Sequence, residues 1–191
     1  MSATTWKLDP AHTQVEFAVK HMMFTTVRGR FGDVEGSVRL DLDNPQASSV
    51  EVEIGAASID TGVEDRDAHL RSGDFLNVEE HPHLTFMSTR VEGAPSEAGD
   101  TFKVVGDLTI RGTTREVVLD AEFEGTGADP WGGTRAGFTA KTKIDRRDFG
   151  LTWNQALETG GVLVGQEVKI ELQVQAVKEE AEVEEAATAG V

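Results

Sequence analysis

The sequence predicts an all-β protein built from antiparallel strands that each have one buried and one solvated face. Apolar and polar residues alternate with a period of two, as at Val15, Phe17 and Val19, and this pattern returns along most of the chain. All five prolines lie between the alternating runs, where a missing N–H leaves the strand ladders intact. Many such strands in succession are typical of a β-sandwich or a closed barrel.

The alternation marks about eight substantial strands, after a short first strand around Trp6 and Leu8. Their apolar positions, in chain order, are Val15, Phe17 and Val19; Val34, Val38, Leu40 and Leu42; Val50, Val52 and Ile54; Leu84 and Phe86; Phe102, Val104, Leu108 and Ile110; Val117, Leu119, Ala121 and Phe123; Phe138, Ala140 and Ile144; and Val168, Ile170, Leu172, Val174 and Ala176.

Two segments interrupt this pattern. In "DTGVEDRDAHLRSGDFL", Thr61 and Glu64 match a capping box, and Val63, Asp67 and Leu70 have helical spacing. We therefore expect a short helix over residues 62–73, lying over one end of the sheet. The second segment, "RRDFGLTWNQALETGG", has no clean alternation, and we expect a turn of helix or a loop at a barrel mouth.

The length of 191 residues suits one well-cored domain, which we place at residues 1–177. From Lys178 the chain reads "KEEAEVEEAATAGV", where a charge run is mixed with small residues. This composition predicts an acidic, disordered tail over residues 178–191.

The composition excludes several classes of function. The chain has 34 acidic and 18 basic side chains, and the formal net charge of −16 repels phosphate backbones, so we expect no nucleic-acid partner. It has no cysteine, which excludes disulfides and thiolate metal sites. No stretch approaches the roughly 20 apolar residues that span a bilayer, and no signal-peptide pattern opens the sequence. We expect a cytoplasmic protein without stable membrane insertion, or a secreted one if a signal peptide has been removed.

Two polar clusters suggest a metal or acid/base site. His81 and His83 flank a proline and point to the same side of an extended segment, but no third ligand has a recognisable spacing, so we predict no metal site. The cluster between Asp65 and His69 has no accompanying nucleophile, and a helix with an acidic first turn explains it equally well. We predict no catalytic residues and no enzyme. The alternative is a metal-assisted or acid/base enzyme that uses both clusters.

The stretch "KHMMFTTVRGRFG" combines basic side chains with flexible apolar ones. In one interpretation the basic group receives an anionic or polar head while the apolar side chains hold a tail. In the other, a strand and a turn place methionine and phenylalanine in the core, and the residue pattern leaves both open. The basic members are Lys20, His21, Arg28 and Arg30, and the apolar members are Met22, Met23, Phe24 and Phe31.

Four segments together resemble the YceI family of lipocalin-like, polyisoprenoid-binding proteins: "WKLDPAHTQVEFAVKHMMFTTVRGRF", "ASIDTGVEDRDAHLRSGDFLNVEEHPHLTFMST", "GDLTIRGTTREVVL" and "IDRRDFGL". The resemblance runs in the family's order from about residue 6 to residue 176. It implies an eight-stranded antiparallel barrel whose apolar cavity holds a long isoprenoid or a similar amphiphile. No enzymatic activity is firmly attached to that family. The resemblance also makes the short helix a closure element at one end of the barrel.

Barrels of about eight strands hold either their own side chains or one slender ligand. Small residues on or near the inward faces favour a cavity, namely Gly36, Ala56, Ala121, Ala136 and Ala140. We therefore expect a protein that binds and carries or stores a long-chain isoprenoid lipid, either a polyprenyl phosphate or an isoprenoid quinone, with no other cofactor. A stress-linked barrel that binds proteins is a further rival, and a homodimer is compatible with the sequence. The expected ligand contacts are Phe17, His21, Met22, Phe24, Arg28, Phe31, His69, Leu70, Phe75, Phe86, Phe138, Phe149 and Trp153.

Overall fold

The computed structural model describes residues 3–41 and 43–180, and most of the predicted acidic tail lies outside them. The regular elements, in chain order, are β1 (Thr4–Leu8), β2 (Gln14–His21), β3 (Thr25–Phe31), β4 (Val34–Leu40), η1 (Pro45–Ala47), β5 (Ser49–Gly55), η2 (Ala56–Ser58), β6 (Ile59–Asp60), α1 (Glu64–Arg71), β7 (His83–Glu92), β8 (Thr101–Ile110), β9 (Thr113–Ala128), β10 (Thr134–Asp145), η3 (Arg146–Phe149) and β11 (Val164–Lys178).

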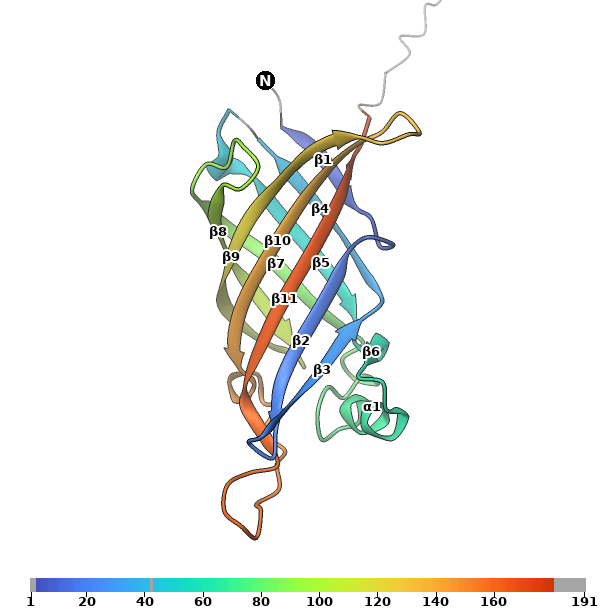
Figure 1. Ribbon diagram of the computed structural model, residues 1–191, viewed down its shortest axis with the longest axis vertical. Helices are drawn as coiled ribbons and strands as arrows, with labels where there is room; N and C mark the ends of the chain where they lie inside the picture. The colour runs from blue at the N-terminus through green and yellow to red at the C-terminus, as the bar shows by residue number, and fades with distance from the viewer. Residues whose placement is uncertain (1–2, 42, 181–191) are drawn as a thin grey trace, which may run out of the picture.

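The strands form one antiparallel sheet that closes into a barrel (Figure 1). The order β1-β4-β5-β7-β8-β9-β10-β11 returns to β1, because Lys7 and Leu8 pair with Val177 and Ala176. β1 and β2 lie one after the other along the same edge of β11, so these two segments share one position in the barrel. β4 and β3 share the next position, where they pair with β1 and β2. β5 and β6 share the position after that, where they pair with β4 and β3. Because these three pairs each share one strand position, the eleven strands make the eight-stranded barrel that the resemblance implies.

The strand register shows how the alternation of apolar and polar residues places the apolar side chains inside the barrel. Between β10 and β11, the inward residues Phe138 and Ala140 lie opposite Val174 and Leu172, while the outward Lys141 lies opposite a glutamate. Successive side chains on a strand point to opposite faces, so one face of every strand is apolar and turned toward the barrel interior. The prediction of one buried and one solvated face is confirmed.

Buried side chains gather in two clusters along the barrel. One includes Trp6, Leu8 and Ala176 near the end at which the described chain begins and ends, and the other includes Phe149 and Leu151 toward α1 (Figure 1). We call these two ends the opposite end and the α1 end. The α1 end also carries the β2–β3 turn and the loop over residues 150–163.

The short helix is confirmed, but its expected start is wrong. α1 begins at Glu64 after Val63, which provides no side-chain cap, and Thr61 does not form the expected capping box. The backbone N–H and the Oγ1 hydroxyl of Thr61 both donate to Oδ1 of Asp67, at 2.9 and 2.5 Å. Gly62, with a φ of 83°, turns the chain so that Thr61 faces this buried carboxylate instead of Glu64.

The second irregular segment also agrees with expectation. η3 forms a single turn directly after β10, and the loop that follows contains one isolated bridge, between Ala156 and Val162. In the part of the chain that the structure describes, no helix is long and apolar enough to cross a membrane.

Candidate ligand-binding cavity

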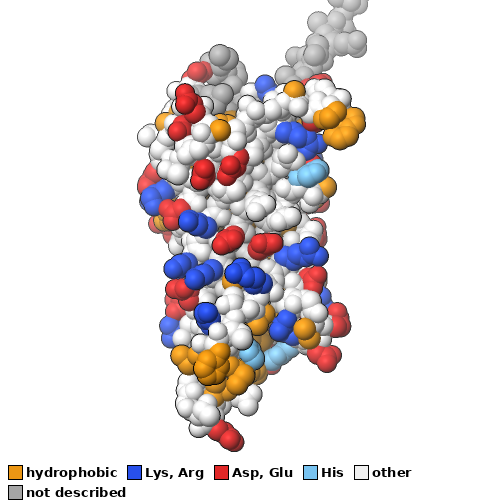
Figure 2. Space-filling view, viewed as in Figure 1, with side chains coloured by type: hydrophobic (Ala, Val, Ile, Leu, Met, Phe, Trp, Pro, Cys, Tyr) orange, Lys and Arg blue, Asp and Glu red, His pale blue; other side chains and the backbone are white. Residues whose placement is uncertain are grey.

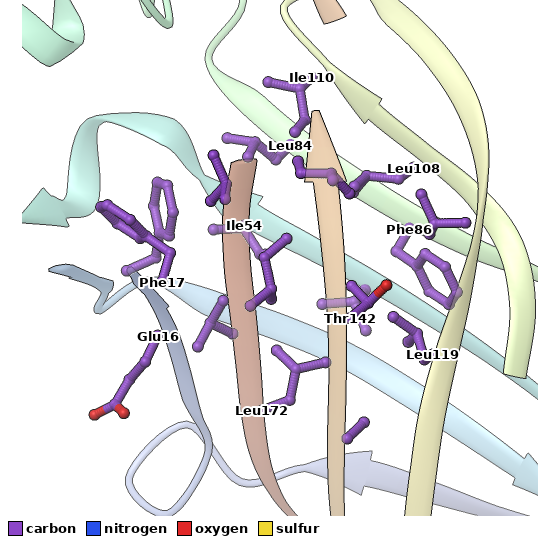
Figure 3. Close-up of a pocket in the computed structure, with 18 of the residues that line it drawn as sticks. Glu16, Phe17, Ile54, Leu84, Phe86, Leu108, Ile110, Leu119, Thr142 and Leu172 are labelled. Carbon is purple, nitrogen blue, oxygen red and sulfur yellow. The ribbon is translucent and has the colours of Figure 1, made fainter. Parts of the chain in front are cut away.

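The barrel encloses an elongated cavity of about 590 Å³ whose wall is almost entirely apolar. Figure 3 shows Ile54, Leu84, Leu108 and Leu172 projecting from different strands toward one common space, whereas the carboxylate of Glu16 points away from it. The volume lies within the range of about 300–1,000 Å³ that is common for small-molecule sites. The interior is therefore a cavity and not a filled core.

The cavity is long as well as apolar. Val164 and Val174 both line it and are separated by ten positions on β11, which corresponds to about 33 Å along the strand. With the tilt of about 35–45° typical of barrel strands, the cavity extends about 25 Å along the barrel axis. A single extended chain suits this shape better than a compact ring system.

Only some of the predicted small residues create this space. Ala121 and Ala140 line the cavity, whereas Ala56 and Ala136 pack in the two core clusters. At Gly36 a Cβ atom would lie 3.0 Å from Leu8 Cδ1, so a neighbouring side chain fills the room that this glycine leaves.

Thr142 places a hydroxyl group in the apolar wall (Figure 3). It lies on β10 opposite Ile170, in the inward series that also contains Ala140 and Ile144. The hydroxyl makes no hydrogen bond with the described residues, and it is not a fully buried atom. It can therefore bind a polar ligand atom inside the barrel.

Three aromatic rings stand together at the α1 end. The ring of His69 meets that of Trp153 edge-on at 4.6 Å and that of Phe75 at 5.0 Å, and the rings of Phe75 and Trp153 are 5.4 Å apart. All three residues line the cavity. His69 Nε2 also lies 2.8 Å from Asp74 Oδ2, which fixes the ring. The cluster forms an aromatic wall at this end of the cavity.

Two arginines add positive charge at the same end. Arg146 is 4% exposed and donates to the carbonyl oxygens of Leu151, Trp153 and Gly165 at 2.6, 2.9 and 2.8 Å. Burial lowers the pKa of its guanidinium group, but arginine stays protonated in proteins. Arg66 binds the hydroxyl and the carbonyl oxygen of Thr61 at 2.7 and 2.8 Å.

The two guanidinium groups line the cavity, and neither forms an ion pair with a described residue. Asp65 contributes one carboxylate to the same region. The α1 end is therefore polar and carries unpaired positive charge, in contrast to the apolar barrel interior. This arrangement suits an amphiphile with its polar group at the α1 end.

Comparison with known proteins identifies the family. The YceI-like domain model matches residues 6–176. The chain belongs to the YceI family. A UPF0312 protein of Pseudomonas aeruginosa (strain LESB58) is 40% identical over 179 residues, which cover 93% of this chain and 88% of the relative.

Solved structures show the same fold. Burkholderia cenocepacia BcnA superimposes with a TM-score of 0.75 at 24% identity, covering 88% of this chain and 98% of BcnA. A polyisoprenoid binding domain from Saccharophagus degradans, implicated in plant cell wall breakdown, gives a TM-score of 0.67 at 12% identity, covering 92% of this chain and 99% of that domain. At these identities the likeness concerns the fold of the YceI barrel.

Most of the residues expected to contact a ligand line the cavity of this YceI barrel. These are Phe17, His21, Phe31, His69, Leu70, Phe75, Phe86, Phe138 and Trp153.

Four of the expected contacts lie elsewhere. Met22 and Phe24 are exposed in the β2–β3 turn, so these two side chains neither fill the core nor hold a tail inside the barrel. Arg28 alternates with the inward Val27 and Gly29 and therefore points to solvent, as does Arg30. Phe149, which is 2% exposed, is packed in the core cluster at the α1 end.

Arg146 and Thr142 were missed by sequence reasoning, although a usable signal exists. Both continue the period-two series that runs through Phe138, Ala140 and Ile144 on the inward face. Thr142 lies within the series and Arg146 directly follows its last apolar member, so counting every second residue regardless of polarity would have placed both at the cavity. Their polar character hid them, because an alternation is usually followed through apolar residues.

Of the histidines in the alternative interpretation, His69 lines the cavity, whereas His81 and His83 do not. His83 Nδ1 lies 3.2 Å from Glu53 Oε1 on the outside of the barrel, and His81 lies beside Gly112 in a turn. Among the described residues, no group of three or more His, Asp or Glu side chains is placed to hold a metal ion.

Proposed function

We propose that this YceI protein binds a long-chain isoprenoid lipid, such as a polyprenyl phosphate or an isoprenoid quinone, and carries or stores it in the barrel. The observation that supports the proposal is the apolar cavity of about 590 Å³ with a polar, positively charged end. Removing an apolar chain from water is favourable by about 0.8 kcal/mol per buried CH₂ group. A cavity of this length takes up many such groups from one ligand.

The polar group of the ligand lies at the α1 end in this proposal. Arg66 and Arg146 supply the charge that a phosphate needs, and the rings of His69 and Trp153 provide a face for a quinone ring. The name of the Saccharophagus degradans domain agrees with this ligand class.

A pair of matched variants tests the proposal. Ala140→Phe places a ring in the cavity, whereas Lys141→Phe places the same ring on the outer face of the next residue of β10. Titration of a polyprenyl phosphate and an isoprenoid quinone should show at least about ten-fold weaker binding for Ala140→Phe. The Lys141→Phe variant should bind as the unmodified protein does. Equal binding by both variants would place the ligand outside the barrel.

A further inference from the structure

The turn between β2 and β3 exposes three consecutive apolar side chains. Met22, Met23 and Phe24 are 39%, 64% and 82% exposed. Figure 2 shows apolar side chains gathered at the lower end of this face of the molecule, which is the α1 end. Single exposed apolar residues are common on soluble proteins, but a contiguous exposed group marks an interaction surface. We call residues 22–24 the hairpin tip.

The backbone holds the hairpin tip in an unusual conformation. Met22 and Met23 have φ values of 51° and 65°, in the left-handed region that residues other than glycine rarely occupy. The N–H of Met22 donates to the carbonyl oxygen of Leu163 at 2.8 Å, and the N–H of Phe24 donates to that of His21 at 3.2 Å. Backbone strain of this kind persists only where surrounding contacts maintain it. The contacts keep the three side chains turned toward solvent.

A row of basic residues crosses the outer face near this tip. Lys143 on β10 pairs with Lys169 on β11, which pairs with Ala18 on β2, which in turn pairs with Arg28 on β3. None of the three cations forms an ion pair with a described residue. Like charges directly opposite each other destabilise a sheet, so the row has a cost in the isolated protein. Figure 2 shows Lys and Arg side chains across the middle and lower part of this face.

The distance between the hairpin tip and the basic row matches the depth to which apolar segments enter a membrane interface. Arg28 follows Phe24 by four residues, about 13 Å along an extended strand. Apolar segments that bind at membrane interfaces are buried by about 5–10 Å, and Lys and Arg side chains extend several ångströms from their backbone toward phosphate groups. A tip immersed to that depth brings the basic row to the level of the lipid head groups.

We propose that the protein docks on the surface of a phospholipid membrane through the hairpin tip, with Arg28, Lys169 and Lys143 near the lipid phosphates. The cavity ends beside this tip, because His21 and Leu163 line the cavity and adjoin Met22 in the chain or by hydrogen bond. The proposal rests on the proposed function for its purpose, which is to let an isoprenoid pass from bilayer to barrel without crossing water.

The rest of the molecule sets the orientation of docking. With a formal net charge of −16, most of the surface is repelled by an anionic bilayer. Three carboxylates weaken the approach along the barrel axis: Glu158 in the loop beside the hairpin tip, Asp65 of α1, and Glu167, which lies between Lys169 and the α1 end. The tip therefore meets the membrane obliquely. At the opposite end, Trp131 is 84% exposed in the β9–β10 turn and provides a matched control.

Vesicle flotation tests the docking directly, with vesicles of phosphatidylcholine or of phosphatidylcholine mixed with phosphatidylglycerol. Met23→Ser combined with Phe24→Ser should reduce binding to both vesicles by about ten-fold or more, because most of the apolar contact is lost. Trp131→Ser should bind as the unmodified protein does. Lys169→Gln should reduce binding to the mixed vesicles about five-fold, whereas Lys103→Gln should not, because Lys103 lies three strands away on β8 and is already paired with Asp120. Unchanged melting temperatures show that the variants are folded.

Two outcomes would overturn the proposal. Equal binding by the unmodified protein and the hairpin-tip double variant would show that the tip is not the contact. Absent vesicle binding, together with dimers in analytical ultracentrifugation that the double variant abolishes, would show that a second copy covers the tip.

Loading experiments separate this proposal from the proposed function. The hairpin-tip double variant should take up an isoprenoid quinone added from ethanol normally, but should take it up slowly from vesicles. If the unmodified protein binds vesicles but takes up no isoprenoid by either route, the proposed function fails and the docking stands.

Discussion

At the scale of single residues, Asp9 connects the bend between β1 and β2 to the start of β10. Its Oδ2 atom accepts hydrogen bonds from Arg135 Nη1 at 2.5 Å and His12 Nδ1 at 2.9 Å. Arg135 also binds Asp129 in the β9–β10 turn at 3.0 Å. The hydrogen bonds from Arg135 and then His12 lower the pKa of Asp9 to about 2 from an ordinary value of 3.8.

A pKa depressed in the folded state stabilises the fold at pH values above the unfolded pKa, and this stability is lost as the pH falls through the folded pKa. Asp9→Asn should therefore lower the free energy of unfolding by about 1–2 kcal/mol at pH 7. The difference from the unmodified protein should disappear between about pH 4 and pH 2. Urea denaturation across this pH range measures it, with Asp107→Asn as an exposed control. A difference that persists at pH 2 would assign the effect to packing.

Arg146 is the second residue whose hydrogen bonds hold separate segments of the chain together. One buried side chain binds four carbonyl oxygens of the loop and of β11. Arg147 beside it is exposed and pairs with Asp145 at 2.6 Å. Removing Arg146 leaves buried carbonyl groups without donors.

The Arg146→Met variant should lower the free energy of unfolding by about 2–4 kcal/mol, and Arg147→Met by less than about 1 kcal/mol. Chemical denaturation of the two variants compares them. Similar losses for both would show that the loop is held by other contacts.

At the scale of elements, α1 is attached to the barrel by Arg71, which donates to two backbone carbonyl oxygens of the preceding segment, and by Asp67. The carboxylate is buried and accepts both hydrogen bonds from Thr61, while the neighbouring acidic residues Glu64 and Asp65 are solvated. The helix is short, and isolated helices of this length are not stable in water. Its position at the cavity end therefore depends on these polar contacts and on the packing of Leu70.

The Asp67→Ala variant should increase hydrogen exchange in α1 and at the cavity end while leaving the barrel strands protected, because the opening is local. Exchange measured by mass spectrometry can locate the change, and Asp65→Ala is the exposed control. Uniformly faster exchange in all strands would mean that α1 is part of the global folding unit.

The strands could be predicted from the sequence because their alternation is a direct consequence of one apolar wall. The sequence did not predict that β1 and β2, or β3 and β4, share single positions in the barrel. This sharing depends on which edge of a distant strand each segment pairs with. Met22 and Phe24 of the hairpin tip were expected to contact the ligand, but both are exposed, for a local reason. Methionine and phenylalanine are normally buried, and only the left-handed backbone at Met22 and Met23 turns them outward.

At the scale of the whole molecule, closure of the barrel creates the cavity. Pairing of β1 with β11 removes the free sheet edges, and the inward faces then surround one apolar space. The sequence predicted a cavity from its small residues, but the room comes largely from the barrel itself. Ala121 and Ala140 contribute, whereas the space beside Gly36 is filled by Leu8.

If this space holds a lipid, mass spectrometry of an organic extract of the purified protein should detect it. We expect one long-chain isoprenoid amphiphile per barrel, with much less in extracts of Ala140→Phe and the full amount in extracts of Lys141→Phe. A protein that is purified empty, and that also takes up no added polyprenyl phosphate or isoprenoid quinone, would contradict this expectation.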